Sequence, residues 1–180
     1  SVLAGDLSRL RGGAVWLAML CLSRPDGALL TAAVILAFGA ANGLRRESIR
    51  LGFRLAWPSA AAVAGQLAFR LLYYHDWIPN TARAKLSLGA ERLAAGLAYL
   101  QHGLEFLWPL LAAALLSALL GRAFSRAMWL VWLPLVMWTA YVALIGGDFF
   151  PGRRLLLPVV VLLAFMIASG LAGIMSTLSR

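Results

Sequence analysis

The chain alternates long apolar stretches with short polar ones. The apolar stretches cover approximately residues 12–23, 28–44, 55–72, 103–120, 127–146 and 155–175. Most approach the length of about 20 helical residues that crosses the hydrocarbon core of a bilayer. A soluble helical bundle could contain one such stretch, but not a series of them. The pattern therefore predicts an all-α fold, a polytopic membrane bundle of about six transmembrane segments.

The polar segment between the third and fourth predicted spans has a periodicity of its own. Four leucines recur at helical spacing between residues 86 and 103, namely Leu86, Leu93, Leu97 and Leu100. This spacing predicts an amphipathic helix that lies along the outer membrane interface. Residues 1–180 then form a single transmembrane domain. Because the chain starts at Ser1 without a signal peptide, we expect a fragment, the later part of a longer polytopic protein.

Composition agrees with a membrane protein. Hydrophobic residues make up 62% of the chain and the mean hydropathy is +0.84, whereas an ordinary globular domain is about half apolar. The net charge of +9 lies in short loops, not on one basic face, so it indicates membrane orientation and anionic lipid contacts instead of nucleic acid. Cys21 is the only cysteine, so neither an internal disulfide nor a thiolate metal site can form.

The loops differ in their charges when they are assigned alternately to the two sides of a membrane. The side that contains residues 44–54 has a weak excess of arginine, which favours it as cytoplasmic. Most of the acidic residues fall on the other side: Asp26, Asp76, Glu91, Glu105 and Asp148. The inner loops therefore resemble topology signals, and the outer loops, which mix both signs, resemble binding surfaces.

Three polar segments interrupt the apolar pattern on the outer side. They are residues 24–27 (RPDG), 73–85 (YYHDWIPNTARAK) and 146–154 (GGDFFPGRR). Each contains a carboxylate and at least one cation beside proline or glycine. Because charge at a membrane boundary is costly, its concentration there usually marks a function. We therefore predict that these segments form the functional site.

The first two segments also have structural interpretations. Arg24 and Asp26 form either a plain turn with the adjacent proline and glycine or the floor of an outward cavity. Tyr74 and Trp77 are either interfacial belt aromatics or stacking partners of a substrate. His75 is either an interfacial histidine or a side chain held in one tautomer by its acidic neighbour.

The remainder of the second segment is equally open. Asn80 and Thr81 either cap a following helix or hydrogen-bond sugar hydroxyls, while Arg83 and Lys85 suit a phosphate.

The third segment favours function more strongly. Its glycines let backbone approach a ligand closely, and Arg153 and Arg154 suit a phosphate at the membrane surface. The alternative is a tight hairpin with snorkelling arginines. A plain hairpin needs neither Asp148 nor the two aromatic residues that follow it.

Taken in order, the motifs RPDG, YYxDxxPNTxxAK and GGDFFPGRR after a tryptophan-rich span resemble polytopic glycosyltransferases of the GT-C superfamily. The closest branch contains the mycobacterial terminal β-(1→2) arabinofuranosyltransferase. The resemblance runs from about Leu17 to Leu157. It departs at His75, where glycine is expected, at Arg83, where an aromatic residue is usual, and at Phe150, which replaces methionine.

The resemblance implies an inverting enzyme on the extracytoplasmic face of the bacterial inner membrane. It would transfer a sugar from a polyprenyl-phosphate donor to a glycan acceptor of the cell envelope, among membrane lipids. Asp148 and Asp76 are the catalytic candidates. The substrate-binding candidates are Arg24, Asp26, Tyr74, His75, Trp77, Asn80, Thr81, Arg83, Lys85, Phe149, Arg153 and Arg154.

The resemblance also implies what this chain does not supply. The family carries its main catalytic carboxylate in a first outer loop, and we expect that loop upstream of this chain. The fragment alone would then be inactive. No cofactor is assigned and no metal ligand is named, although a divalent cation is compatible with the mechanism.

Two other classes of function fit the spans. A transporter or flippase of a lipid-linked or small anionic substrate usually has ionisable groups near mid-membrane, where this chain has few. A non-catalytic scaffold explains the spans but not the three polar segments.

Overall fold

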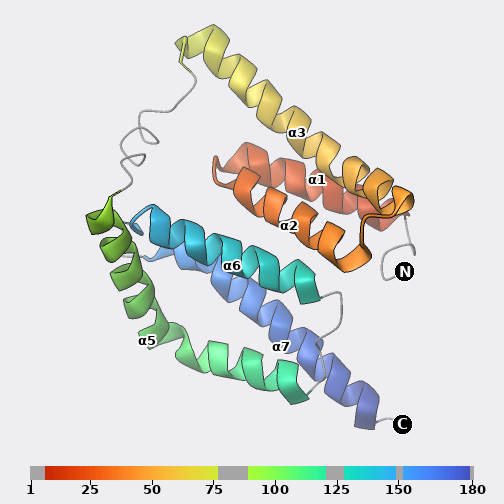
Figure 1. Ribbon diagram of the computed structural model, residues 1–180, viewed down its shortest axis with the longest axis vertical. Coiled ribbons are helices and arrows are strands. Elements are labelled where there is room, and N and C mark those ends of the chain that lie inside the picture. Colours follow the sequence, from red (N-terminus) through yellow and green to blue (C-terminus); the bar gives the residue numbers. More distant parts are fainter. Residues whose placement is uncertain (1–6, 77–88, 121–127, 149–151, 179–180) are drawn as a thin grey trace. The chain divides into compact units, whose positions relative to one another are not determined.

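The computed structural model describes residues 7–76, 89–120, 128–148 and 152–178 (Figure 1). Within these ranges the chain is all-α, with six α-helices, one short 3-10 helix and no strand. The predicted all-α class is confirmed. The chain divides into two compact units, residues 1–84 and 85–180, and each is described by itself. The prediction of a single transmembrane domain stays a prediction.

The first unit contains α1 (Leu7–Ser23), α2 (Gly27–Asn42) and α3 (Arg46–Tyr74). Short turns join them, so α1 and α3 run in the same direction and pack along one another. Small residues let the helices approach: a Cβ at Gly27 would overlap the carbonyl of Leu20. The buried Cys21 thiol lies 3.3 Å from the Thr31 hydroxyl, so it packs inside the unit, as expected for a small hydrophobic residue.

The second unit contains α5 (Ala90–Leu120), α6 (Trp129–Leu144), η2 (Arg154–Leu156) and α7 (Leu157–Leu178). Its core cluster consists of Ala114, Ala118, Met128, Leu135, Leu163 and Met166. α5 and α7 make the most extensive helix pair. At their contact a Cβ on Gly170 would overlap the backbone of Ser117, so small residues bring these two backbones together.

Two segments of the described chain are long and apolar enough to cross a membrane: α5 and Arg154–Thr177, which consists of η2 and all of α7 but its last residue. Three other apolar helical stretches are shorter: Leu10–Ser23, Gly27–Asn42 and Trp129–Leu144. The predicted helices near residues 12–23, 28–44 and 127–146 therefore exist. Their crossing of a membrane belongs to the proposal below.

The structure differs from the sequence prediction in α5. We expected a separate interfacial helix before a fourth span at 103–120, but one helix runs continuously from Ala90 to Leu120. Figure 1 shows that this helix changes direction part-way along its length. Pro109 gives a physical reason, because proline removes the hydrogen bond to the carbonyl four residues earlier. The hydropathy pattern therefore predicted a boundary between two helices where the structure has a bend within one helix.

α3 also begins earlier than its predicted span of 55–72. It starts at Arg46, with Glu47 in the first turn, where a carboxylate interacts favourably with the helix dipole. Its first two turns are rich in arginine, so hydropathy alone did not include them.

Candidate functional site

The third polar segment lies against the first half of α5. Gly146 and Gly147 follow α6 with φ values of 82° and 77°, in the left-handed region that favours glycine. A Cβ at Gly146 would collide with the Arg92 side chain, and one at Gly147 with the Tyr99 ring. The backbone at these glycines approaches α5 closely, and the predicted approach to a ligand stays a prediction.

Asp148 and Arg154 form an ion pair across this loop. Arg154 Nε donates to Asp148 Oδ2 at 2.5 Å, and Nη2 lies 3.5 Å from Oδ1. The carboxylate is buried, with 4% of its side chain exposed, whereas 56% of the arginine side chain is exposed. In this geometry Asp148 orients Arg154, whose side chain remains more than half exposed. The catalytic role of Asp148 stays a prediction.

Arg153 fastens the same loop to α5. Its backbone is left-handed, with φ of 44°, and its guanidinium donates to the His102 carbonyl. The Arg153 guanidinium carbon also lies 4.5 Å from the centre of the Phe106 ring, in a cation–π contact. The residue after Arg154, Leu155, is also held: its carbonyl accepts a hydrogen bond from Nε1 of the buried Trp138 at 2.7 Å. The two adjacent arginines are therefore held in different positions by different partners.

The sequence did not single out the partners on α5. Four residues of α5 contact Gly146, Gly147 or Arg153, and none of the four belongs to a predicted polar segment. They are Arg92, Tyr99, His102 and Phe106. Their spacing of three, four and seven residues places them on one face of the helix. Helical periodicity over residues 90–106 could have predicted that these four residues share a face. The sequence prediction took that periodicity from the leucines alone.

A groove of about 390 Å³ lies beside these arginines. Gly103, Phe106 and Leu107 of α5 line it together with Arg153 and Arg154. Leu156, Leu157 and Val160 complete its far wall.

A second groove, of about 440 Å³, shares Gly103, Leu107 and Leu156 with the first. Its remaining walls come mainly from leucine side chains of α5, α6 and α7. The two grooves adjoin at these shared residues, and the guanidinium groups line only the first of them.

In the first unit, the first polar segment is both a turn and an ion pair. Arg24 donates through Nε and Nη2 to the two carboxylate oxygens of Asp26, at 2.9 and 2.8 Å. The Asp26 side chain is 11% exposed. Asp26 occupies the N-cap position of α2, but it makes no side-chain capping bond there. The carboxylate is engaged by Arg24 instead.

This turn lies beside the end of α3. A cavity of about 470 Å³ is lined by Pro25, Gln66, Arg70 and Tyr74 among others. Gln66 Nε2 donates to the Leu22 carbonyl at 3.1 Å, which joins α3 to the end of α1. The first polar segment and the beginning of the second therefore meet at one end of this unit, as a shared outer side requires.

The end of α3 carries an aromatic cluster. Phe69 and Tyr73 stack at 5.5 Å between ring centres, and Tyr74 meets both rings edge-on. His75 ends the helix in the left-handed conformation, with φ of 52°, and its N–H donates to the Leu71 carbonyl. This is a position that glycine usually takes, so it is the kind of site where the expected glycine would be favoured.

Six predicted residues lie outside the described part of the chain: Trp77, Asn80, Thr81, Arg83, Lys85 and Phe149. In one unit the structure pairs Arg24 with Asp26, while the Pro25 between them lines a cavity together with Tyr74. In the other unit it brings together Asp148, Arg153 and Arg154. That both sets face one pocket stays a prediction. Within the described ranges, no three His, Cys, Asp or Glu side chains are grouped so that they could hold a metal ion.

No family model matches the chain, and neither a curated protein nor a solved structure matches it.

Proposed function

We propose that this chain is a multi-pass protein of the bacterial inner membrane whose outer face transfers a sugar from a polyprenyl-phosphate donor to a cell-envelope glycan. Membrane insertion is supported by the exposure of its two long apolar helices. Only 22% and 28% of their most apolar windows are buried. A core helix of a soluble protein would be mostly buried, so these helices need another apolar environment, which a bilayer supplies.

The observation that carries the proposed chemistry is that Arg153 and Arg154 line a groove that adjoins a second, leucine-lined groove along α5. A polyprenyl phosphate has the matching shape, a long apolar chain with an anionic head. The polyprenyl tail would lie on the leucine-lined wall, and the phosphate would contact the two guanidinium groups. Arginine suits this task because its planar fork can bind phosphate through two parallel hydrogen bonds.

The proposed reaction needs cations at the leaving group more than it needs an acid. An acceptor hydroxyl attacks the anomeric carbon, the bond between that carbon and the phosphate oxygen breaks, and a carboxylate takes the hydroxyl proton. Charge develops on the departing phosphate, where preorganised guanidinium groups stabilise it. Asp148 contributes by orienting Arg154, and Asp76 remains a candidate base. The principal base belongs, in this proposal, to a loop outside the chain.

The remaining contacts would hold the sugar. Tyr74 and its aromatic neighbours present ring faces at the end of α3, which suit stacking on a sugar. Arg24 and Asp26, which are paired with each other, are the candidates for hydrogen bonds to the hydroxyl groups of the sugar.

The test is transfer of radiolabelled sugar from a polyprenyl-phosphate donor to an acceptor, in membranes that carry the whole protein. We expect Arg153→Gln and Arg154→Gln each to lower transfer by about tenfold or more, the effect of losing one charge-assisted hydrogen bond of about 1.5–3 kcal/mol. Arg50→Gln, an exposed arginine of α3 outside the grooves, is the matched control and should leave transfer unchanged.

Unchanged transfer in both variants would overturn the site assignment. Vesicle uptake of the donor without transfer would instead favour the transporter or flippase alternative.

A further inference from the structure

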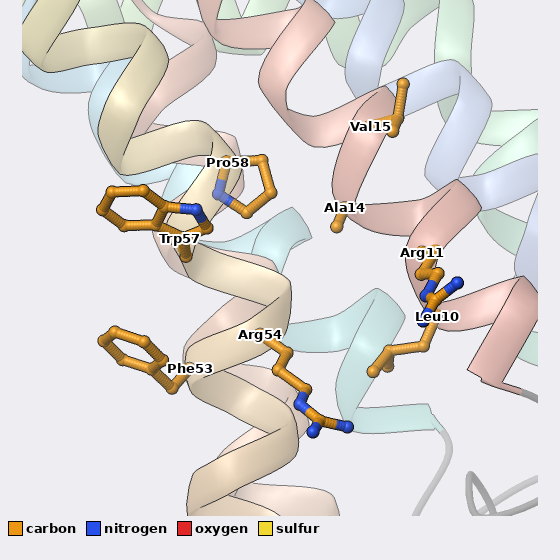
Figure 2. Close-up of a pocket in the computed structure, with 8 residues that line it drawn as sticks. All are labelled: Leu10, Arg11, Ala14, Val15, Phe53, Arg54, Trp57 and Pro58. Atoms are coloured by element: carbon orange, nitrogen blue, oxygen red, sulfur yellow. The ribbon is translucent and has the colours of Figure 1, made fainter.

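A groove lies between the surfaces of α1 and α3 in the first unit, away from the three polar segments. Its volume is about 550 Å³, and its walls are almost wholly apolar. Leu10 and Ala14 of α1 line it together with Phe53 and Trp57 of α3, whose rings extend in this view to the side of α3 away from α1 (Figure 2). Phe53 and Trp57 are exposed, at 69% and 59%, so the aromatic edge of the groove is open to the surroundings.

Two arginines are the charged residues that line this groove. Figure 2 shows the guanidinium groups of Arg11 and Arg54 at the same end, one from each helix. Among the described residues no carboxylate lines the groove, and neither arginine forms an ion pair with any of them. Two like charges facing one apolar groove repel each other unless an anion lies between them. The arrangement is therefore complementary to an anionic head group with an apolar tail.

The groove lies at the end of the unit where further arginines gather. The α2–α3 turn and the first turns of α3 place Arg45, Arg46 and Arg50 there, with Glu47 as the acidic residue of this stretch. It is the opposite end from the Arg24–Asp26 turn, because α1 and α3 begin here and end there. In the predicted orientation this end is cytoplasmic, where anionic lipids create a negative surface potential.

We infer that this groove is a binding site for an anionic phospholipid of the cytoplasmic leaflet. The phosphate lies between Arg11 and Arg54, an acyl chain lies along the apolar walls, and Trp57 contacts the lipid at the groove's edge. The inference rests on the membrane insertion proposed above, but not on sugar transfer. It adds a second lipid site at the other end of the first unit from the predicted catalytic face.

Tryptophan quenching tests the site directly. The whole protein is reconstituted into nanodiscs that contain a trace of brominated phosphatidylglycerol or brominated phosphatidylcholine. The contribution of Trp57 is obtained by subtracting the signal of Trp57→Phe. We expect Trp57 to be quenched at least threefold more by the anionic lipid. In Arg11→Gln/Arg54→Gln the ratio should fall to about one, and 1 M salt should lower it in the unsubstituted protein.

Arg45→Gln is the matched control, because this exposed arginine lies at the same end of the unit but does not line the groove. It should keep the preference. Equal quenching by both lipids in the unsubstituted protein would overturn the inference, as would a preference that survives in the double variant. If sugar transfer fails while lipid preference persists, the proposed function is wrong and this site stands.

Discussion

At the scale of single residues, the ion pair between Asp148 and Arg154 is asymmetric. The carboxylate is almost fully buried, and the guanidinium is more than half exposed. A buried carboxylate needs its partner, because an unpaired charge away from water is costly. The exposed arginine can instead be solvated when the partner is neutral. The sequence showed both residues in one segment but not which of the two depends on the other.

Replacing each partner separately should reveal this asymmetry. We expect Arg154→Ala to lower the free energy of unfolding by about 1–3 kcal/mol, since it removes the Arg154 hydrogen bonds from the buried Asp148 carboxylate. Asp148→Asn removes the charge and keeps the shape, so its cost should stay below about 1 kcal/mol. Thermal unfolding in detergent micelles, followed by circular dichroism, measures both. Equal losses in the two variants would contradict the argument.

At the scale of elements, α5 shows why a correct periodicity led to an incomplete interpretation. Leu93, Leu97 and Leu104 are substantially exposed, while Gly96 and Gly103 face the rest of the unit. In a soluble protein the leucine stripe would mark the buried face. In a lipid environment leucine gains nothing by leaving the bilayer, and small residues make the helix contacts. The leucines therefore predicted the helix but not its packed face.

A pair of glycine substitutions tests this packing. A Cβ at Gly96 would overlap the Ala143 carbonyl, whereas one at Gly39, inside α2, meets nothing within 4 Å. We expect Gly96→Ala to destabilise the protein by about 1–3 kcal/mol through overpacking. Gly39→Ala should stabilise it by about 0.5–1 kcal/mol, because alanine has the higher helix propensity. Both values come from thermal unfolding, and a neutral Gly96→Ala would show that α5 and α6 do not pack as described.

At the scale of the whole molecule, the proposed function depends on sidedness. Every described α-helix exposes large apolar side chains. Among them are Trp16, Phe69, Trp108 and Phe165. A surface of this kind marks a site of contact with a membrane or another apolar partner, and it supports the proposed membrane insertion. Helix order within each unit then fixes which turns share an end, and the three polar segments are predicted to share the outer side.

Cysteine labelling in intact cells tests that sidedness. In a Cys21→Ala background, single cysteines replace Tyr74, Gly152 or Leu44, all of which are exposed. We expect a membrane-impermeant maleimide to label positions 74 and 152 from outside, and position 44 only after the membrane is permeabilised. Labelling of positions 74 and 152 from opposite sides would remove the basis for a common site.

The sequence by itself determined the helical class, the approximate positions of the helices and the presence of charged turns, because hydropathy and local turn chemistry act over a few residues. It could not determine that residues 90–120 form one bent helix, since a hydropathy boundary and a proline bend look alike in one dimension. Only the tertiary structure decided the partners: His102 and Phe106 for Arg153, and Arg92 and Tyr99 for the glycines. Those contacts join residues about 50 positions apart, and no local pattern encodes which of two helical faces will meet.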